Sequence, residues 1–244
     1  MKYTYNQDNK TEYYGEVNSL TNEKEGRGIQ IWGDGSKYSG YWIKNKASIK
    51  GKFIYSDGSE YEGEMSKGHS NGIGKYTNSS GGIYEGHWKN DLQDGKGKEQ
   101  WPDGLVYEGD FLNGKKTGIG TLKWSDGSVY EGSFSHNYIH GKGKFTWSDQ
   151  RKYIGEWKNN KMSGEGEFTW PDGRKYKGSY KNDKKEGYGE FFWADKRIYK
   201  GLWKDGKQNG KGMIYNPITN KWKVGIWKKG IKVQWNDDND INNN

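Results

Sequence analysis

Few residues of this chain have the types and spacing that catalysis or metal binding requires. His136 and His140 stand four apart, but a metal pair at that spacing needs a helix, which the surrounding sequence does not favour. Residues 109–116 and 201–208 approach a phosphate-binding glycine loop, yet neither has the Ser or Thr that would hold magnesium. We therefore expect no catalytic, cofactor-binding or metal-binding site.

Composition points to a fold built from aromatic rings. Of the 244 residues, 30% are hydrophobic and 30% are charged, which is typical of disorder. However, 13 Trp, 19 Tyr and 7 Phe accompany 39 Gly, so rings supply the apolar area that aliphatic side chains usually provide. The sequence has no Cys, which excludes a disulfide framework and a thiolate metal site.

The amino-terminal segment and the charge bear on location and partners. Residues 1–10 are too polar for a secretory signal, and no apolar run reaches membrane-spanning length, so we expect a soluble, intracellular protein. The net charge of +8 favours acidic partners such as anionic lipid, an acidic protein surface or nucleic acid. Solubility alone is the simpler explanation of a Lys-rich surface.

Aromatic residues recur with a constant period. Eight tyrosines, which we call the repeat tyrosines (position 0 of each copy), stand 23 residues apart. An earlier copy starts at Tyr13 with two extra residues, and Trp222 stands 23 residues after Tyr199, the last repeat tyrosine. The eight are Tyr38, Tyr61, Tyr84, Tyr107, Tyr130, Tyr153, Tyr176 and Tyr199.

Within each copy the features alternate with the period of a β-strand. Gly follows at +2, an aromatic or apolar residue at +4, Gly at +11 and +13, often Phe at +15 and Trp at +17, then Asp-Gly at +19 and +20. These spacings of two predict two short strands per copy and an all-β chain. Asp-Gly indicates a hairpin turn, and the other turn, which carries Asn159-Asn160 in one copy, is expected to be longer.

Charge predicts how the strands pair. If +4 faces +11, then Gly at +2 faces Gly at +13 and +1 faces +14; none of the seven resulting +1/+14 pairs is like-charged. The pairs at +3 and +12 in the same register do not help to decide it, and they include the like-charged pair Glu156/Glu165. On the polar face the first strands then run from acidic to basic, through Glu62, Glu85, Glu108 and Glu131 to Lys177 and Lys200.

One face of every hairpin carries rings and glycines, and the other is charged. Because the chain encodes no second layer, each ring must lie over glycines of neighbouring strands, where any side chain would occupy its place. We expect an elongated single-layer antiparallel sheet of tandem hairpins, in which each copy touches only its neighbours. At about 4.8 Å per strand the array would form a rod or trough on the order of 80 to 90 Å long.

The copy at residues 107–121, followed by Trp-Ser-Asp-Gly at 124–127, resembles the MORN (membrane occupation and recognition nexus) repeat, and the match covers nearly the whole chain. Ile49 at +11 and Asn78 at +17 depart from the pattern. In that family the repeats form an elongated antiparallel sheet and act in membrane apposition, in cytoskeletal and ciliary scaffolds, or beside kinase or methyltransferase domains. The resemblance implies a non-catalytic scaffold without selecting which one.

We divide the chain into a lead-in at 1–12, the repeat array at 13–235 with a terminal half-copy from 222, and an Asn/Asp tail at 236–244 that we expect to be disordered. In the half-copy the glycine comes one place late, at Gly225, so the stack should terminate there. The alternation that follows predicts a final hairpin whose exposed edge invites pairing, and thus a homodimer. This self-association edge comprises Trp227, Ile231, Val233 and Trp235.

Two further surfaces are expected to bind partners. Protein partners come first, on the ring-bearing face, and anionic lipid second, on the basic stretch at 175–211. Nucleic acid is disfavoured because the periodic rings already serve to cover glycine. The aromatic candidates are Tyr84, Trp88, Trp101, Tyr107, Phe111, Trp124, Tyr130, Phe134, Trp147, Tyr153, Trp157, Trp170, Tyr176, Tyr180, Trp193, Tyr199 and Trp203. The basic candidates are Lys175, Lys177, Lys181, Lys184, Lys185, Lys200 and Lys204.

From the resemblance we expect a scaffold that binds other proteins of a cytoskeletal or ciliary (axonemal) assembly. It would be cytoplasmic, at the cytoskeleton or cilium, with peripheral membrane attachment if anionic lipid is bound. The alternative is an accessory regulatory or membrane-targeting module for a separate enzyme such as a phosphoinositide kinase. Co-sedimentation with cytoskeletal fractions would support the first, and detergent-released kinase activity the second.

Overall fold

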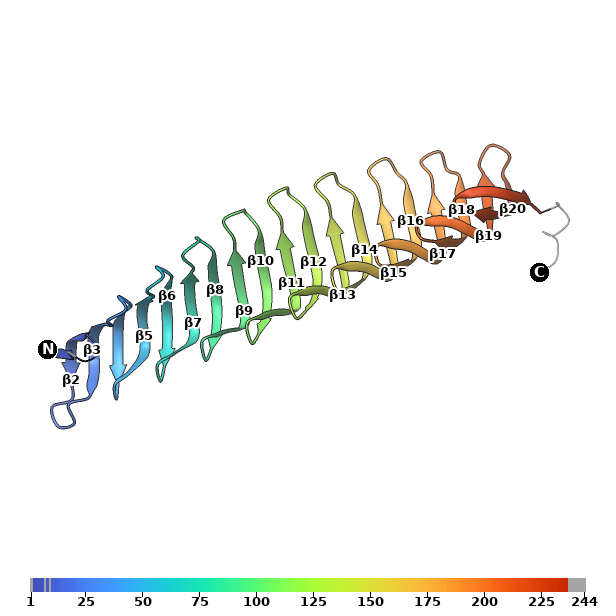
Figure 1. The fold of residues 1–244 in the computed structure, drawn as a ribbon. Coiled ribbons are helices and arrows are strands. Elements are labelled where there is room, and N and C mark those ends of the chain that lie inside the picture. The colour runs from blue at the N-terminus through green and yellow to red at the C-terminus, as the bar shows by residue number, and fades with distance from the viewer. Residues whose placement is uncertain (1, 7, 9, 237–244) are drawn as a thin grey trace. The chain divides into compact units, whose positions relative to one another are not determined.

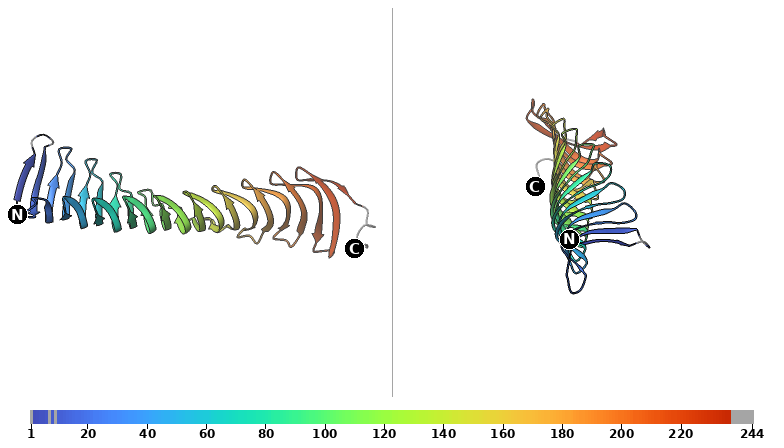
Figure 2. Two further views of the ribbon diagram at one scale, coloured as in Figure 1. Left: turned by 90° about the horizontal axis from the view of Figure 1, so that it is seen from below. Right: turned by 90° about the vertical axis from the view of Figure 1, so that its left-hand side faces the viewer.

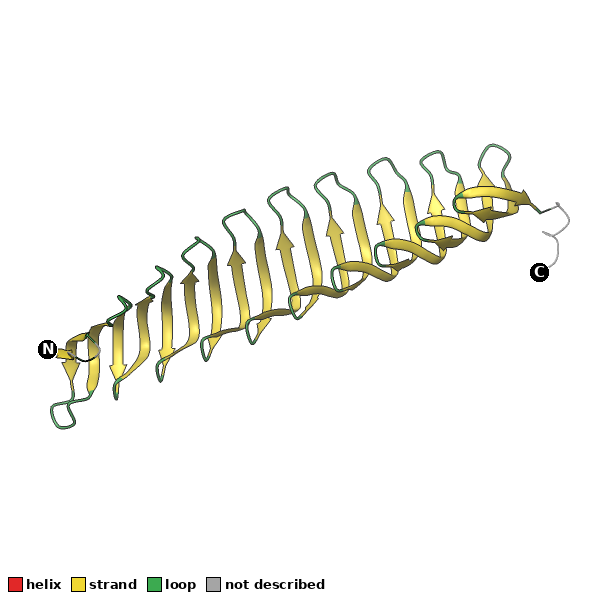
Figure 3. Ribbon diagram, viewed as in Figure 1, coloured by secondary structure: helices red, strands yellow, loops and turns green. Residues whose placement is uncertain are grey.

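Every regular element in the described part of the chain is a β-strand (Figure 3). The structure is a computed structural model that describes residues 2–6, 8 and 10–236. Residues 237–244 of the expected tail lie outside the described residues. The all-β prediction is confirmed.

The chain divides into an N-terminal unit that ends at Ser125 and a C-terminal unit that begins at Asp126. Within each unit, strands that are consecutive in sequence pair antiparallel (Figure 1). The N-terminal unit contains β1 (Lys2–Asn6), β2 (Thr11–Val17), β3 (Lys24–Ile31), β4 (Lys37–Ile43), β5 (Lys46–Ile54), β6 (Glu60–Ser66), β7 (His69–Thr77), β8 (Ile83–Lys89), β9 (Leu92–Gln100), β10 (Val106–Leu112) and β11 (Lys115–Lys123). The C-terminal unit contains β12 (Val129–Ser135), β13 (Tyr138–Thr146), β14 (Lys152–Lys158), β15 (Lys161–Thr169), β16 (Lys175–Lys181), β17 (Lys184–Phe192), β18 (Ile198–Lys204), β19 (Lys207–Asn216), β20 (Lys221–Lys228) and β21 (Ile231–Trp235).

Each unit is one layer of strands. Figure 2 shows the strands side by side, with no second layer over either face within a unit. β1 falls inside residues 1–12, the expected lead-in, and pairs with β2. None of the described residues forms a helix long and apolar enough to cross a membrane.

The repeat tyrosines form the core of this single layer. All eight, from Tyr38 to Tyr199, are at most 2% exposed. A Cβ on Gly155 would lie 2.5 Å from the hydroxyl of Tyr153 and 2.6 Å from the Cα of Gly166 across the hairpin. The ring therefore covers the glycine of its own strand and that of the partner strand, and a side chain at either place would displace it.

The predicted register is confirmed at the glycines and wrong beyond them. In β14 and β15, Gly155 faces Gly166 as expected, but Trp157 at +4 faces Met162 at +9 and not the residue at +11. The cause is a β-bulge between +2 and +4. The seven predicted +1/+14 pairs are all present: Glu62/Lys75, Glu85/Lys98, Glu108/Thr121, Glu131/Lys144, Ile154/Glu167, Lys177/Glu190 and Lys200/Met213.

The bulge explains the glycine at +11. Gly164 at this position has a φ of +65°, in the left-handed region that glycine adopts without steric cost. Ile49 stands at +11 in the copy of Tyr38 and has the same φ of 65°, which is strained for a β-branched residue. The glycine at +11 thus serves backbone geometry, whereas those at +2 and +13 make room for the ring.

The bulge also explains why the repeat residue is tyrosine. The hydroxyl of Tyr153 donates a hydrogen bond of 3.0 Å to the carbonyl oxygen of Glu156 at +3, a residue that the bulge leaves without a partner in β15. A buried carbonyl without a donor would cost free energy, so the hydroxyl stabilises the bulge. The same bond forms in all nine copies, from Tyr13 to Tyr199.

The lengths of the two turns are the reverse of those expected. The connection between +5 and +8 contains only two residues, both with positive φ, as at Asn159 (49°) and Asn160 (65°). The Asp-Gly connection is the longer one: the backbone N–H of Trp101 donates to the oxygen of Leu105 at 2.9 Å. The tight turn is therefore formed by residues that tolerate a left-handed backbone, such as Asn159 and Asn160, and not by the Asp-Gly pair.

The charged face alternates in sign between neighbouring strands. The first strands do run from acidic to basic, but the +14 residues of the second strands stand between them. Glu85, for example, lies between Lys75 and Lys98. Within each unit the face is therefore a ladder of opposite charges, interrupted by neutral residues such as Thr121, Ile154 and Met213, and not two stripes of opposite sign.

The frame slips by one residue after β19. Lys223 faces Ile214, so Trp222 does not take the register position of a repeat tyrosine. Because successive side chains of a strand point to opposite faces, one extra residue places Trp222 on the charged face. There the Nζ of Lys200 lies 5.8 Å from its ring centroid. β20 and β21 form the final hairpin expected after Gly225.

Candidate interaction surfaces

The expected ring-bearing face divides into a buried part and a half-exposed part. The buried rings hold the sheet together and offer no surface to a partner, whereas the half-exposed rings do. The buried candidates are Tyr84, Tyr107, Phe111, Tyr130, Phe134, Tyr153, Trp157, Tyr176, Tyr180, Tyr199 and Trp203. The half-exposed candidates are Trp88, Trp101, Trp124, Trp147, Trp170 and Trp193.

The rings at +4 connect successive copies. Trp157 packs edge-on against Tyr153 of its own copy and Tyr130 of the preceding copy, with ring centroids 5.1 and 5.6 Å apart. Its indole N–H donates to the carbonyl oxygen of Gly143 at 3.4 Å. A ring contact and a hydrogen bond join each copy with Trp at +4 to the copy before it, as at Trp42, Trp88, Trp157 and Trp203.

The half-exposed tryptophans at +17 lie beside the longer turns, which contain Asp-Gly in most copies and Asp149-Gln150 or Asp195-Lys196 in two others. In the C-terminal unit an arginine of the same turn covers the ring, as Arg174 does over Trp170 with its guanidinium carbon 5.4 Å from the ring centroid. Asp172 holds this arginine at 2.7 Å. Arg151 and Arg197 repeat the arrangement over Trp147 and Trp193. In the N-terminal unit the corresponding turn residues are Ser36, Ser59, Gly82 and Leu105.

Lys185, at +9 of its copy, is enclosed by four rings that we call the Lys185 cage. Its Nζ lies between 4.7 and 5.3 Å from the four ring centroids. Burial lowers the pKa of Lys185 to about 8, with a smaller contribution from Arg174, while the ring faces favour the ammonium and oppose part of this fall. The cage comprises Trp170, Tyr176, Phe191 and Trp203. Lys185 is thus held inside the sheet and does not reach an anionic surface.

Two other copies hold a lysine in the same way. Lys116 lies 4.6 Å from the ring centroid of Trp101 and 5.2 Å from that of Tyr107, and it pairs with Glu99 at 2.6 Å. Lys24 lies 4.6 Å from the ring centroid of Trp42, and burial lowers its pKa. An internal ammonium among rings is therefore a recurring arrangement in this array.

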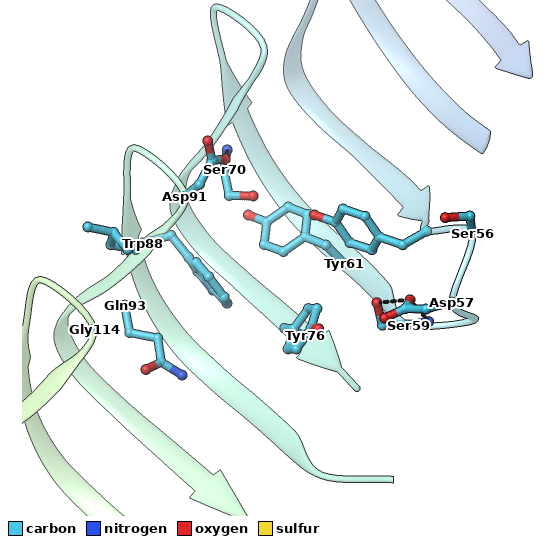
Figure 4. A pocket seen from close by; sticks show the side chains of 12 residues that line it. Ser56, Asp57, Ser59, Tyr61, Ser70, Tyr76, Trp88, Asp91, Gln93 and Gly114 are labelled. Atoms are coloured by element: carbon cyan, nitrogen blue, oxygen red, sulfur yellow. Dashed lines mark hydrogen bonds between the residues drawn. The ribbon is translucent and has the colours of Figure 1, made fainter. Parts of the chain in front are cut away.

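In the copy of Tyr61 the +9 residue is Ser70, and the corresponding space is a cavity of 570 Å³ (Figure 4). Four rings line it from the same repeat positions as those around Lys185. We call them the Ser70 cage. It comprises Tyr55, Tyr61, Tyr76 and Trp88.

Two acidic residues line the same cavity. The hydroxyl of Ser59 donates to Asp57 at 2.6 Å, and this bond holds the pKa of the carboxyl below its ordinary value, so Asp57 is ionised. Asp91 accepts the backbone N–H of Ser70 at 2.7 Å and lies 2.5 Å from the Nδ1 of His69. Among the described residues, no Lys or Arg lines this cavity.

Three basic candidates are engaged within the sheet. Lys175 lies 3.5 Å from Glu167, and Lys200 lies 3.1 Å from Glu190. Lys177 is flanked by these same two glutamates in the ladder of the charged face. These three lysines share two glutamates, so only one of their three positive charges is uncompensated.

The other basic candidates, Lys181, Lys184 and Lys204, lie at the tight turns of the C-terminal unit. Lys184 is 3.3 Å from Asp205. In three consecutive hairpins two lysines face each other across such a turn, and we call them the turn lysines. The pairs are Lys158/Lys161, Lys181/Lys184 and Lys204/Lys207. A cavity of 430 Å³ beside the last pair is lined by Lys204, Asp205, Lys207, Asn209, Lys228 and Lys229.

The expected self-association edge is exposed except for one residue. Ile231, Val233 and Trp235 of β21 are 70%, 58% and 38% exposed. Trp227 is buried and packs edge-on against Tyr199, with ring centroids 5.0 Å apart. Trp227 therefore attaches the last hairpin to the array, and the other three residues are left for pairing.

The period, the paired glycines and the hairpins are those of a known family. The model of the MORN repeat matches residues 22–37, 38–60, 61–83, 84–106, 107–129, 130–150, 153–173, 176–196 and 199–217. The chain belongs to the MORN-repeat family. MORN repeats are generally non-catalytic modules that interact with proteins and lipids, and they occur in cytoskeletal and membrane-associated proteins.

Other comparisons with this MORN-repeat chain add little. No curated protein matches it. Among solved structures, the G-box domain of the microcephaly protein CPAP is 12% identical, with a TM-score of 0.43 over 83% of this chain and 100% of that chain. The TCP10c domain of Drosophila melanogaster Sas-4 is 13% identical, with a TM-score of 0.36 over 73% of this chain and 99% of that chain. At these TM-scores the similarity carries no argument about function.

The importance of the residue at +9 could not be predicted from the sequence. The sequence does show that the residue type at +9 varies between copies while the surrounding repeat is constant, as at Ser70, Lys116 and Lys185. The pattern becomes meaningful only when the bulge places +9 opposite +4 and directs its side chain among the rings.

Proposed function

We propose that this MORN array is a non-catalytic scaffold that binds other proteins of a cytoskeletal or ciliary assembly through its ring-bearing face. The observation that carries the proposal is that half-exposed tryptophans stand beside the buried tyrosine core within each unit. Tryptophan is a favoured anchor at protein interfaces. Because the core fixes these rings before any partner arrives, docking would order few side chains and lose little entropy.

Capture of cytoskeletal or axonemal proteins tests this role. The double variant Trp147→Ser/Trp170→Ser should lose co-sedimentation with such a fraction, because it removes two neighbouring anchors. Tyr188→Ser is the matched control, since Tyr188 is 55% exposed and lies on the charged face of β17. Equal loss in both variants, or no co-sedimentation of the natural protein, would contradict the proposal.

A second role, docking to anionic membranes, is favoured by the turn lysines. Like charges directly opposite each other in a hairpin are unfavourable, so three such pairs in succession suit a surface that supplies counter-charge. Basic residues near an anionic membrane contribute about 1 kcal/mol each. This role fits the alternative of a membrane-targeting module for a separate enzyme such as a phosphoinositide kinase.

Liposome flotation separates the two roles. The natural protein should float with vesicles that contain phosphatidylserine and remain below with neutral vesicles, and raised salt should abolish flotation. Lys181→Gln/Lys204→Gln should weaken flotation more than Lys123→Gln/Lys152→Gln, which removes the same charge away from the tight turns. Equal effects of the two double variants would exclude docking through the turn lysines, and detergent-released lipid kinase activity would support the accessory role.

A further inference from the structure

The Ser70 cage has the ring spacing of the Lys185 cage, while two of its ring pairs are tilted differently. The planes of Tyr76 and Trp88 lie at 67°, against 43° for the equivalent pair around Lys185, and those of Tyr55 and Tyr76 lie at 71°, against 53°. The centroid distances are 5.3 Å for Tyr61 to Trp88 and 6.3 Å for Tyr76 to Trp88. Around Lys185 the equivalent distances are 5.2 Å for Tyr176 to Trp203 and 6.2 Å for Phe191 to Trp203. The ring centroids of Tyr55 and Tyr76 lie 6.3 Å apart, and those of the equivalent pair, Trp170 and Phe191, lie 5.8 Å apart. The two cages thus share their ring spacings within about half an ångström and differ in ring tilt and in what stands at their centre.

The residue at +9 determines the content of each cage. The side chain of Lys185 reaches the centre of its cage from β17, whereas Ser70 on β7 is too short to do so. The copy of Tyr38 also has a small +9 residue, Ala47, but there Met65 takes the place of a +4 ring. The Ser70 cage therefore combines four rings with a small +9 residue.

The geometry points to the Ser70 cage as a binding site for the lysine side chain of a partner protein, unmodified or methylated. This inference rests on the proposed protein-binding role and specifies its partner chemistry at one site. The Lys185 cage shows that this arrangement of rings accommodates a lysine ammonium. Cages of several rings are the usual recognition site for ammonium groups, including methyl-lysine.

The charge of the cavity fits the same occupant. Asp57 and Asp91 line it, and the described lining has no basic residue. Tyr55, one of the lining rings, is 39% exposed, so the cavity is reached from solvent. In Figure 4, Tyr61, Tyr76 and Trp88 stand around the cavity and Asp91 lies beside Ser70. A cation that enters therefore meets ring faces and a negative rim.

Filling the cage from within provides the decisive test. Ser70→Lys should place an internal ammonium among the rings, as Lys185 does, and block an external one. Ser66→Lys is the matched control, because it adds the same charge at the exposed end of β6, outside the cavity. Trp88→Ala removes one ring of the cage, but it also removes a packing contact with Tyr84, so Ser70→Lys decides the case.

The probe is a capped, fluorescent nonapeptide of Gly and Ser with one central lysine, in unmodified and trimethylated forms, and a Gln version as control. Anisotropy titration of the full chain should show binding of both lysine peptides and not of the Gln peptide. Ser70→Lys should weaken binding roughly tenfold or more, and Ser66→Lys less than about twofold. A circular dichroism melt of each variant should show the natural fold retained.

Three outcomes would overturn the lysine assignment: equal binding of the Gln peptide, equal affinity of Ser70→Lys and Ser66→Lys, or no peptide binding at all. Phosphocholine that displaces the peptide at a lower concentration than free trimethyllysine would instead assign the cage to a lipid headgroup and overturn the protein partner. Co-sedimentation with cytoskeletal proteins is measured separately, so its persistence would leave the scaffold role intact when the cage fails.

Discussion

The copies that begin at Tyr61 and Tyr176 place equivalent rings around different centres. In the C-terminal unit Lys185 fills the space, and Arg174 covers the neighbouring Trp170. In the N-terminal unit the space beside Ser70 is a cavity with two acidic residues on its lining. The framework is the same, so one variable position per copy separates a structural contact from an accessible site.

The difference shows how an identical repeat acquires local function. The repeat tyrosine, the glycines at +2 and +13 and the hydroxyl bond to +3 recur in both copies and maintain the sheet. Position +9 and the turn residue at +21 point to the ring-bearing face without maintaining the backbone. Substitutions there change the surface while the register is retained.

The largest expected effect tests whether the copy of Tyr61 needs glycine to make room for its ring. Gly63→Ala would place a Cβ 2.6 Å from the hydroxyl of Tyr61 and 2.6 Å from the backbone oxygen of Ile73, so we expect a loss of about 3 kcal/mol in the free energy of unfolding. Urea denaturation followed by tryptophan fluorescence measures it. Gly58→Ala is the control: it has positive φ but nothing within 4 Å, so about 1 kcal/mol is expected. Equal losses would mean that ring clearance is not the reason for glycine.

A smaller effect is expected from removing the tyrosine hydroxyl. Tyr61→Phe and Tyr176→Phe each leave a carbonyl at the bulge without its donor, at Glu64 and Ser179 respectively. We expect each to cost about 2 kcal/mol, and the two losses to be equal within error because the bond is common to both copies. Thermal melts of the single variants measure the effect. A loss in only one copy would show that the copies do not share this bond.

High pH should affect the two cages differently, because only the Lys185 cage contains an ammonium of its own. Lys185 has a pKa lowered to about 8, so its charge is unfavourable to folding below about pH 8. This penalty disappears as pH rises toward the ordinary lysine value, because the folded state then binds fewer protons than the unfolded state. The stability of the natural protein relative to Lys185→Met should therefore rise by about 1 kcal/mol between pH 8 and 10, after allowance for the ring attraction. A pH-independent difference would mean that the cage does not perturb the lysine.

The smallest expected effect concerns the charged face. Glu85→Lys would place a lysine between Lys75 and Lys98, so we expect a loss of about 0.5 kcal/mol at low salt that vanishes at high salt. Glu85→Gln is the control and should lose less. Denaturation at two ionic strengths measures the change. A salt-independent loss would show that packing, and not charge, is responsible.

The sequence was sufficient to predict the hairpin fold, the tyrosine and glycine stack and the +1/+14 pairing, because all of these follow the period directly. It was insufficient for the bulge, because the glycine at +11 has the same identity as those at +2 and +13 but a different backbone conformation, as at Gly164. The pairing of +4 with +9 was therefore missed. The turn lengths were exchanged for a related reason, since Asn159 and Asn160 adopt left-handed φ as glycine does.

The candidate surface was only partly predictable. Composition and periodicity located the ring-bearing face, but they did not separate buried rings such as Tyr153 from half-exposed ones such as Trp147. That separation depends on which ring lies under its neighbours. From the sequence alone Lys185 is a candidate for contact with an anionic surface. Its position among rings depends on the pairing across the bulge, which the sequence did not predict.

The one-residue slip after β19 keeps the last hairpin in register with the copy before it. The extra residue in the connection brings Gly225 opposite Gly212 and Trp227 onto Tyr199, although Lys223 stands in the register position of the repeat tyrosine. If the connection closed one residue earlier, Val224 would face Gly212 and Trp227 would turn to the charged face, so the last hairpin would lose its contact with the array. The length of a short surface connection thus decides whether the last hairpin stays attached.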